Sequence, residues 1–176
     1  MTRLVAVVGP SGAGKDTLMA LACAARPGIR AARRVITRPA EAGGEDFEGV
    51  TPASFATRLA GGEFALHWQA HGLSYGIPKA QLTGGGTVLF NASRTVLTEA
   101  QARFPGLRVL LVTAPPAVLA ERLAMRGRED GADQAARLAR ADFVLPKGLA
   151  VVEVVNDGTP EAGLARLLAA LQPESA

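Results

Sequence analysis

Residues 9–18 read GPSGAGKDTL, a glycine-rich stretch that follows the apolar run LVAVV at residues 4–8. Gly9, Gly14 and Lys15 occupy the fixed positions of the phosphate-binding pattern G-x-x-x-x-G-K. Glycines are needed there because backbone N–H groups must converge on phosphate oxygens without interference from a Cβ atom. The apolar run predicts a buried strand, and the residues after the loop predict a helix whose positive dipole end faces the phosphates. We therefore expect this stretch to bind a nucleoside triphosphate.

Asp16 departs from the usual pattern, in which a Ser or Thr hydroxyl at this position ligates Mg²⁺. A carboxylate is also a hard oxygen ligand, so Asp16 is expected to approach Mg²⁺ directly or through water, with the Thr17 hydroxyl beside it. An acid in the first turn of a helix is equally expected from the helix dipole, so both readings stay open. The residues predicted to contact ATP are Gly9, Pro10, Ser11, Gly12, Ala13, Gly14, Lys15, Asp16, Thr17 and Asn156.

The composition indicates one ordinary globular domain. Of the 176 residues, 48% are hydrophobic and 20% charged, and 19 Lys+Arg against 16 Asp+Glu leave a net charge of +3, too small to predict nucleic-acid binding. Cys23 is the one cysteine, which excludes an internal disulfide and suits a reducing cytosol. The sequence shows neither a signal peptide nor an apolar run long enough to span a membrane. We expect a cytoplasmic protein without a membrane partner, either a monomer or a homodimer.

Short apolar runs alternate with helical patterns along the chain, which predicts a parallel α/β sheet covered by helices on both faces. Strands are expected at residues 4–8, 34–36, 64–70, 73–77, 87–91, 107–113 and 151–156, and helices after the loop and at about 51–59, 116–126, 134–143 and 160–171. Such sheets bind ligands beyond the carboxyl ends of their strands. The loops expected to form the site are therefore 9–16, 37–50, 91–95, 113–116 and 156–159.

Residues 121–141 read ERLAMRGREDGADQAARLARA and are rich in arginine. Arg122 and Arg126 are four residues apart, and Arg137 and Arg140 are three apart, so each pair shares a helical face. The glycine-containing turn between the pairs suits a movable flap. Phosphoryl transfer needs positive charge that closes over the γ phosphate and excludes water, so we expect a lid here. A solvated helix face with Glu–Arg pairs is the alternative interpretation.

The chain resembles the guanylate-kinase-like group of P-loop kinases along nearly its whole length. The glycine-rich loop, ITR (36–38), YG (75–76), RLAMRGRE (122–129) and VVND (154–157) fall in the order and approximate spacing of that group. The resemblance implies a P-loop NTPase of the α/β class, with a parallel five-stranded sheet flanked by helices as in nucleoside monophosphate kinases. It also implies an acceptor-binding subdomain at about 37–86 and an Arg-rich lid at about 124–142.

The acceptor side departs from guanylate kinase. That family holds the GMP phosphate with two arginines three residues apart, whereas this chain has Arg38 and then Glu41. Four further replacements fall at acceptor positions: Phe47 for a Tyr, Gln69 for the Glu that reads guanine, and Asn91 and Ser93 for two acids. A pocket built to hydrogen-bond one base loses discrimination when such groups change, so GMP is not the expected acceptor.

The substituted stretches ITRPAEAGGED (36–46), FALHWQAHGLSYGI (64–77) and VLFNASR (88–94) resemble the ribose 1,5-bisphosphate phosphokinases. That family makes 5-phosphoribosyl 1-diphosphate in phosphonate breakdown. Its acceptor has two phosphates and no base, and Arg94 adds a cation at a strand end for the second phosphate. The resemblance implies phosphorylation of this small sugar bisphosphate by ATP with Mg²⁺. The implied acceptor-binding residues are Arg38, Gln69, His71, Tyr75, Asn91, Ser93 and Arg94, and the implied catalytic residues are Lys15, Arg38, Arg122, Arg126 and Arg137.

Two other functions stay open: a guanylate kinase with a divergent acceptor site, and a non-catalytic binding module of the same fold. An intact Lys15 loop and an arginine lid favour an enzyme. If the acceptor-site model holds, Arg38 and Arg94 should face a common cleft in front of Lys15. Alternation along the strand places His67 and His71 on one face, where contacts to ribose hydroxyls are the expected role and ordinary packing is the alternative.

Overall fold

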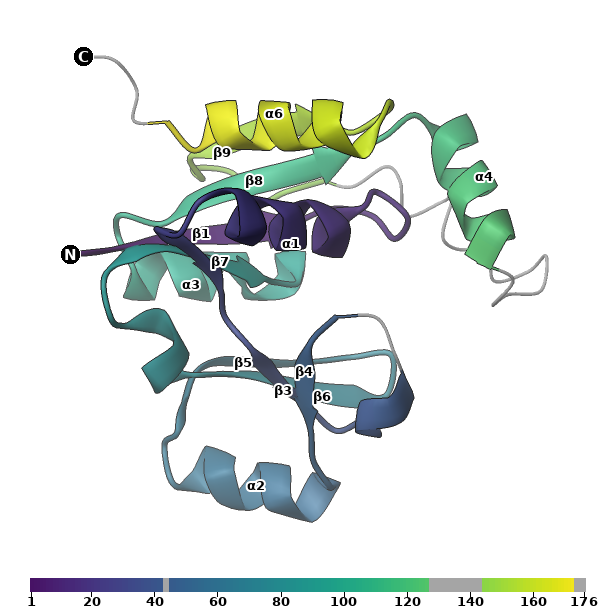
Figure 1. Ribbon diagram of the computed structural model, residues 1–176. Helices are drawn as coiled ribbons and strands as arrows, with labels where there is room; N and C mark the ends of the chain where they lie inside the picture. The colour runs from purple at the N-terminus through teal and green to yellow at the C-terminus, as the bar shows by residue number, and fades with distance from the viewer. Residues whose placement is uncertain (43–44, 127–143, 173–176) are drawn as a thin grey trace.

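A five-stranded parallel sheet is the larger of the two sheets of the molecule (Figure 1). The computed structural model describes residues 1–42, 45–126 and 144–172. The strands are β1 (Thr2–Val8), β2 (Ile29–Ala31), β7 (Gly86–Asn91), β8 (Arg108–Thr113) and β9 (Val151–Val155). They lie in the order β2-β7-β1-β8-β9, and every neighbouring pair is parallel. The five-stranded parallel sheet predicted from the sequence is confirmed.

Helices cover both faces of this sheet (Figure 1). They are α1 (Lys15–Ala25) and α6 (Pro160–Ala170) on one face and α3 (Leu97–Arg103) on the other, with α4 (Pro116–Arg126) beyond the carboxyl end of β8. Successive residues of a strand point to opposite faces. Val5 and Val7 of β1 therefore pack in the cluster that contains Leu18 of α1, while Ala6 packs in the cluster that contains Leu97 of α3.

A smaller mixed sheet forms the second half of the molecule. Its strands are β3 (Arg34–Ile36), β4 (Phe47–Gly49), β5 (Phe64–Ala70) and β6 (Leu73–Pro78), in the order β4-β3-β6-β5. β3 pairs in parallel with β4, whereas β6 is antiparallel to both β3 and β5. Helix α2 (Pro52–Ala60) lies beneath this sheet in Figure 1. It begins as the sequence predicts, because the Thr51 hydroxyl accepts a hydrogen bond from the Ser54 N–H and Pro52 stands at the first helical position.

Three short single-turn helices connect these elements, at η1 (Ala40–Ala42), η2 (Lys79–Leu82) and η3 (Arg94–Val96). The sequence did not predict β2, β4 or α3, because elements of three to seven residues are too short to show a clear period. The predicted helix at 134–143 and most of the predicted lid at 124–142 lie outside the described residues. Among the residues that are described, no helix has both the length and the apolar character that a membrane crossing requires.

Replacing Phe90 with Ala should lower the free energy of unfolding by about 3–5 kcal/mol. Phe90 belongs to β7, and its fully buried ring packs in the cluster on the α3 side of the sheet. Denaturant titration measures this loss. The matched control is Leu59→Ala on the exposed side of α2, which should change the same quantity by about 0.5 kcal/mol or less. Equal losses in the two variants would contradict the assignment of the core.

Candidate active site

The stretch from Gly9 to Gly14 forms a loop between β1 and α1. At Gly9 any Cβ atom would meet the Val112 carbonyl oxygen at 2.1 Å, so the loop can lie against β8 only with glycine there. Gly14 caps α1 with φ of 87°, a left-handed conformation that glycine adopts without strain. The first N–H groups of α1 have no partner within the helix and are therefore available to an anion at this end.

The Lys15 ammonium group bends back over this loop. Its Nζ donates to the carbonyl oxygens of Gly9 at 2.7 Å and Pro10 at 3.3 Å. The contacts hold a positive charge at the mouth of the loop, within the reach of a terminal phosphate. Both the loop conformation and the position of Lys15 agree with the nucleotide-binding pattern read from the sequence.

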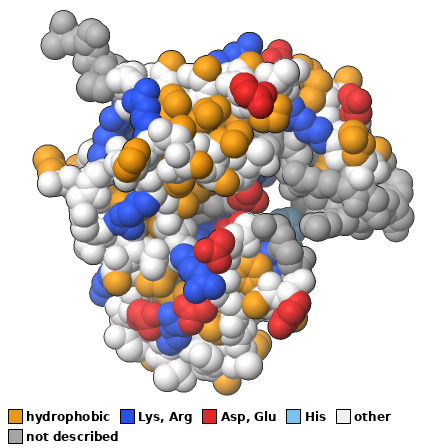
Figure 2. Space-filling model, viewed as in Figure 1, with side chains coloured by type: hydrophobic (Ala, Val, Ile, Leu, Met, Phe, Trp, Pro, Cys, Tyr) orange, Lys and Arg blue, Asp and Glu red, His pale blue; other side chains and the backbone are white. Residues whose placement is uncertain are grey.

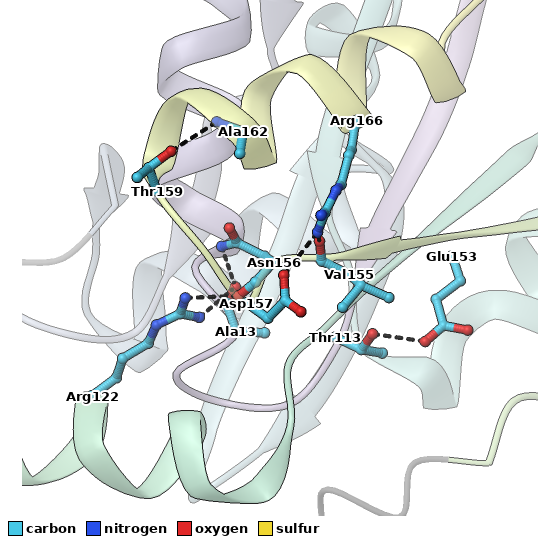
Figure 3. A network of polar contacts seen from close by, with 10 residues as sticks. All are labelled: Ala13, Thr113, Arg122, Glu153, Val155, Asn156, Asp157, Thr159, Ala162 and Arg166. Atoms are coloured by element: carbon cyan, nitrogen blue, oxygen red, sulfur yellow. Dashed lines mark hydrogen bonds and ion pairs between the residues drawn. The ribbon is translucent and has the colours of Figure 1, made fainter.

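Two side chains from distant parts of the chain hold the loop from behind (Figure 3). Asn156, which follows β9 and is 6% exposed, donates from Nδ2 to the Ala13 carbonyl oxygen at 2.8 Å. Arg122 of α4 donates from Nη1 to the Gly12 and Ala13 carbonyl oxygens at 3.2 and 3.4 Å, and from Nη2 to the Asn156 carbonyl oxygen at 2.7 Å. We call this set of contacts the loop clamp.

The loop clamp also depends on two glycines that leave room for the Asn156 side chain. A Cβ atom on Gly14 would lie 2.5 Å from Asn156 Nδ2, and one on Gly163 of α6 would lie 2.4 Å from its Oδ1. Beside the clamp, a hydrogen bond from Arg166 lowers the pKa of the Asp157 carboxyl group. Asn156 is therefore enclosed by the loop and α6.

A cleft of about 590 Å³ opens between the loop and the second sheet. Figure 2 shows this hollow between the upper and lower halves of the molecule. Its wall combines the loop with the ends of β3, β5, β6 and β7. The lining residues are Gly9–Gly12, Gly14–Thr17, Arg34, Arg38, Glu45, Trp68, Ala70, His71, Leu73, Tyr75 and Asn91–Thr95.

Arg38 and Arg94 line this cleft together with Lys15, as the sequence predicted. Arg38 follows β3, and its guanidinium lies 4.3 Å from the centre of the Phe47 ring, a cation–π contact that orients it. Arg94 begins the short helix after β7. His71, Tyr75, Asn91 and Ser93 also line the cleft, so its wall combines the cations Lys15, Arg38 and Arg94 with uncharged polar groups.

Asn91 joins the two sides of the cleft. Its Nδ2 donates to Asp16 Oδ1 at 3.0 Å, and its backbone carbonyl oxygen accepts a 3.4 Å hydrogen bond from Arg34 Nη1. Asp16 and Thr17 are both exposed at the start of α1 and line the cleft, so their oxygens are placed beside any triphosphate bound by the loop.

Several predicted site residues have other surroundings. Gln69 and His67 are exposed and do not line the cleft, because alternation along β5 directs Trp68 to it instead. The expected contacts of Gln69 and His67 with the acceptor therefore have no support in this geometry. Trp68 is largely buried and also lines the cleft.

Asn156 and Arg122 were expected to contact the nucleotide and the transferring group, but neither lines the cleft. In this structure both hydrogen-bond carbonyl oxygens of the loop, and their predicted contacts with the nucleotide and the transferring group stay predictions. Arg137 lies outside the described residues, and Arg126 is described only as the end of α4. The catalytic roles predicted for these two arginines remain predictions.

The sequence interpretation missed Arg34 and Glu45, which form an ion pair in the cleft wall. Arg34 is only 7% exposed although it begins a strand. One local signal could have indicated a functional cation: Arg34 directly precedes the apolar pair Val35-Ile36, which suggests that it is buried. Arginine is rarely buried without a partner.

The fold is similar to that of kinases of known structure. The guanylate kinase of Anaplasma phagocytophilum matches with a TM-score of 0.64 and 19% identity, covering 98% of this chain and 87% of that one. A gluconokinase of Sinorhizobium meliloti matches with a TM-score of 0.52 and 18% identity, covering 95% and 94%. The fold is therefore that of the P-loop kinases.

No protein-family model matches the chain. The ribose 1,5-bisphosphate phosphokinase PhnN of Ruegeria sp. is 52% identical over 98% of this chain and 93% of its own length, and that of Pseudomonas fluorescens is 48% identical over 96% and 94%. The bifunctional ribose 1,5-bisphosphokinase-thymidine phosphorylase of Cupriavidus necator is 51% identical over 94% of this chain and 28% of its own length. The chain belongs to the ribose 1,5-bisphosphate phosphokinase family and is a kinase.

Replacing Asn156 with Ala should raise the Kd for ATP about tenfold, because a buried hydrogen bond that holds the loop is lost. Titration calorimetry with ATP measures the change. The control is Glu153→Ala on β9, which loses only an exposed contact to Thr113 and should keep the wild-type Kd. An unchanged Kd in the Asn156 variant would show that the loop holds its shape without the clamp.

Proposed function

We propose that this kinase transfers the γ phosphoryl group of ATP to the 1-phosphate of ribose 1,5-bisphosphate, giving 5-phospho-α-D-ribose 1-diphosphate and ADP in phosphonate catabolism. The observation that carries the proposal is that Arg38 and Arg94 line one cleft with Lys15. Curated relatives named for this reaction are 43% to 52% identical over nearly the whole chain, which supports the same acceptor here.

The acceptor side of the cleft favours a molecule with two phosphates over a nucleoside monophosphate. Arg38 and Arg94 come from different elements, one after β3 and one after β7, so a phosphate can be bound from each. Gln69, at the position that would read a guanine base, does not line the cleft. A guanylate kinase therefore finds less support than a sugar-bisphosphate kinase, although the two share a fold.

The reaction places few chemical demands on the protein. The nucleophile is a phosphate oxygen that already carries negative charge, so no strong general base is needed. Catalysis then depends on holding the two phosphates in line and on stabilising the charge of the transferring group. Lys15, the loop N–H groups and Arg38 supply that stabilisation from the cleft wall.

We propose that Mg²⁺ binds with ATP and is held by Asp16 and Thr17. The fit is chemical: the Asp16 carboxylate accepts one hydrogen bond from Asn91 and keeps further lone pairs, and the Thr17 hydroxyl stands next to it. No cluster of three or more His, Cys, Asp or Glu side chains suited to a metal occurs among the described residues. Phosphate oxygens and water would supply the remaining ligands, and the ion would neutralise charge on the β and γ phosphates.

The remaining predictions on the reaction belong to the same proposal. Arg126 and Arg137 would close over the γ phosphate as part of the lid, while Arg122 positions the loop. The enzyme is proposed to act in the cytoplasm as a monomer or homodimer, on ATP and a sugar bisphosphate, without nucleic acid.

A coupled ATPase assay that offers ribose 1,5-bisphosphate and GMP side by side tests the proposal. Turnover should occur with the sugar bisphosphate, and Lys15→Ala should lower kcat by about 10²- to 10³-fold, the effect of removing one charge-stabilising donor. Turnover of GMP alone would refute the proposal. Turnover of neither substrate by the folded wild-type protein would do the same.

Replacing Arg94 with Ala should raise the KM for ribose 1,5-bisphosphate about 10- to 100-fold and leave the KM for ATP unchanged, because one charged contact to the acceptor is lost. Steady-state kinetics with each substrate varied in turn separate the two effects. Arg26→Ala is the control, since this exposed arginine follows α1 and does not line the cleft. A rise in the KM for ATP instead would place Arg94 on the nucleotide side.

A further inference from the structure

We infer that the ion pair between Arg34 and Glu45 is the element that recognises the vicinal hydroxyl groups of the sugar acceptor. Arg34 opens β3, and Glu45 stands two residues before β4. Both line the cleft that contains Lys15, Arg38 and Arg94. The inference rests on the proposed function, because it concerns the sugar that lies between the two phosphates.

The pair is buried and bidentate. Arg34 Nε donates to Glu45 Oε2 at 2.9 Å, and Arg34 Nη2 donates to Glu45 Oε1. The Arg34 side chain is 9% exposed and that of Glu45 is 16% exposed. Two charges that leave water to this extent are costly unless each has a partner of good geometry. An ion pair of this kind in the wall of a cleft is thus weak evidence that it stabilises the fold. It is better evidence that the pair binds a ligand.

The guanidinium is held in one orientation by contacts on several sides. Its central carbon lies 5.0 Å from the Tyr75 ring centre and 5.7 Å from the Trp68 ring centre. These two rings are themselves parallel, with an interplanar angle of 2°, and they face each other across the paired strands β5 and β6. The pair is therefore fixed before the acceptor arrives, which lowers the entropy lost on binding.

The pair keeps hydrogen-bonding capacity for a ligand. A carboxylate oxygen has two lone pairs, and each Glu45 oxygen receives one hydrogen bond from Arg34. Two hydroxyl groups on adjacent carbons can donate to the two remaining positions. Of the five N–H groups of Arg34, the described contacts to Glu45 and Asn91 use three.

Charge separates this pair from the phosphate-binding cations of the cleft. Because Arg34 and Glu45 together are neutral, they attract a phosphate dianion far less than an arginine alone does, and Glu45 repels one. Uncharged hydroxyls are the groups of the acceptor that suit a neutral donor–acceptor pair. The phosphates are left to Lys15, Arg38 and Arg94.

The test compares ribose 1,5-bisphosphate with its 2-deoxy and 3-deoxy analogues as acceptors. In the wild-type enzyme at least one deoxy analogue should have a kcat/KM about 10- to 150-fold lower, the range expected when a hydrogen bond to a charged group is lost. In Glu45→Gln the preference for the natural sugar should fall at least about fivefold, because a neutral amide forms weaker hydrogen bonds. Gln is chosen since it keeps an oxygen for Arg34.

Glu48→Gln is the matched control. Glu48 of β4 also forms an ion pair with an arginine, Arg58, at 2.7 Å, but it does not line the cleft. This variant should keep the wild-type preference for the natural sugar. The melting temperature of each variant checks that it is folded, and if Glu45→Gln does not fold, the comparison of acceptors in the wild-type enzyme decides the question.

The experiment distinguishes failure of the inference from failure of the proposed function. If the wild-type enzyme uses the natural sugar and both deoxy analogues equally well, or if Glu45→Gln keeps the full preference, the pair does not recognise the hydroxyls while the proposed function stands. If the wild-type enzyme does not phosphorylate ribose 1,5-bisphosphate at all, the proposed function and the inference both fail.

Discussion

The hydrogen bonds that hold the carbonyl side of the phosphate loop are the contacts on which the active site depends. A loop that offers its N–H groups to phosphates must have its carbonyl oxygens occupied elsewhere. Asn156 and Arg122 occupy them from the opposite side, and both come from segments more than 100 residues away along the chain. Helix α4 and the segment after β9 therefore support the shape of the loop together with its own glycines.

The second sheet and the segment after β7 form the wall of the cleft opposite the loop. In the proposed function Arg38 and Arg94 bind phosphates, and the Arg34–Glu45 pair is inferred to bind hydroxyls. Asn91 connects this side to the loop, since it contacts Arg34 through its backbone and Asp16 through its side chain. Asp16, which stands where the usual pattern has a hydroxyl, thus has a hydrogen-bond partner on β7.

The parts of the site that could be predicted from the sequence are those fixed by local spacing. The loop from Gly9 to Lys15 and the positions of Arg38 and Arg94 after strands are of this kind. The contact between Arg34 and Glu45 could not be predicted, because the two residues are joined by a loop. The sequence of a loop has no hydrophobic periodicity from which its path could be read. Asn156 was expected at the nucleotide because it follows the last strand. Its hydrogen bond to Ala13 could not be foreseen, because the two residues are 143 positions apart in the chain.

The central claim is that the γ phosphoryl group moves onto the 1-phosphate of the sugar. ³¹P NMR of the folded enzyme with ATP and ribose 1,5-bisphosphate tests it directly. The account predicts two mutually coupled diphosphate signals of a sugar 1-diphosphate besides those of ADP, with the 5-phosphate monoester unchanged. A new uncoupled monoester signal, which would mean transfer to a sugar hydroxyl, or consumption of ATP without any new sugar phosphate, would contradict it.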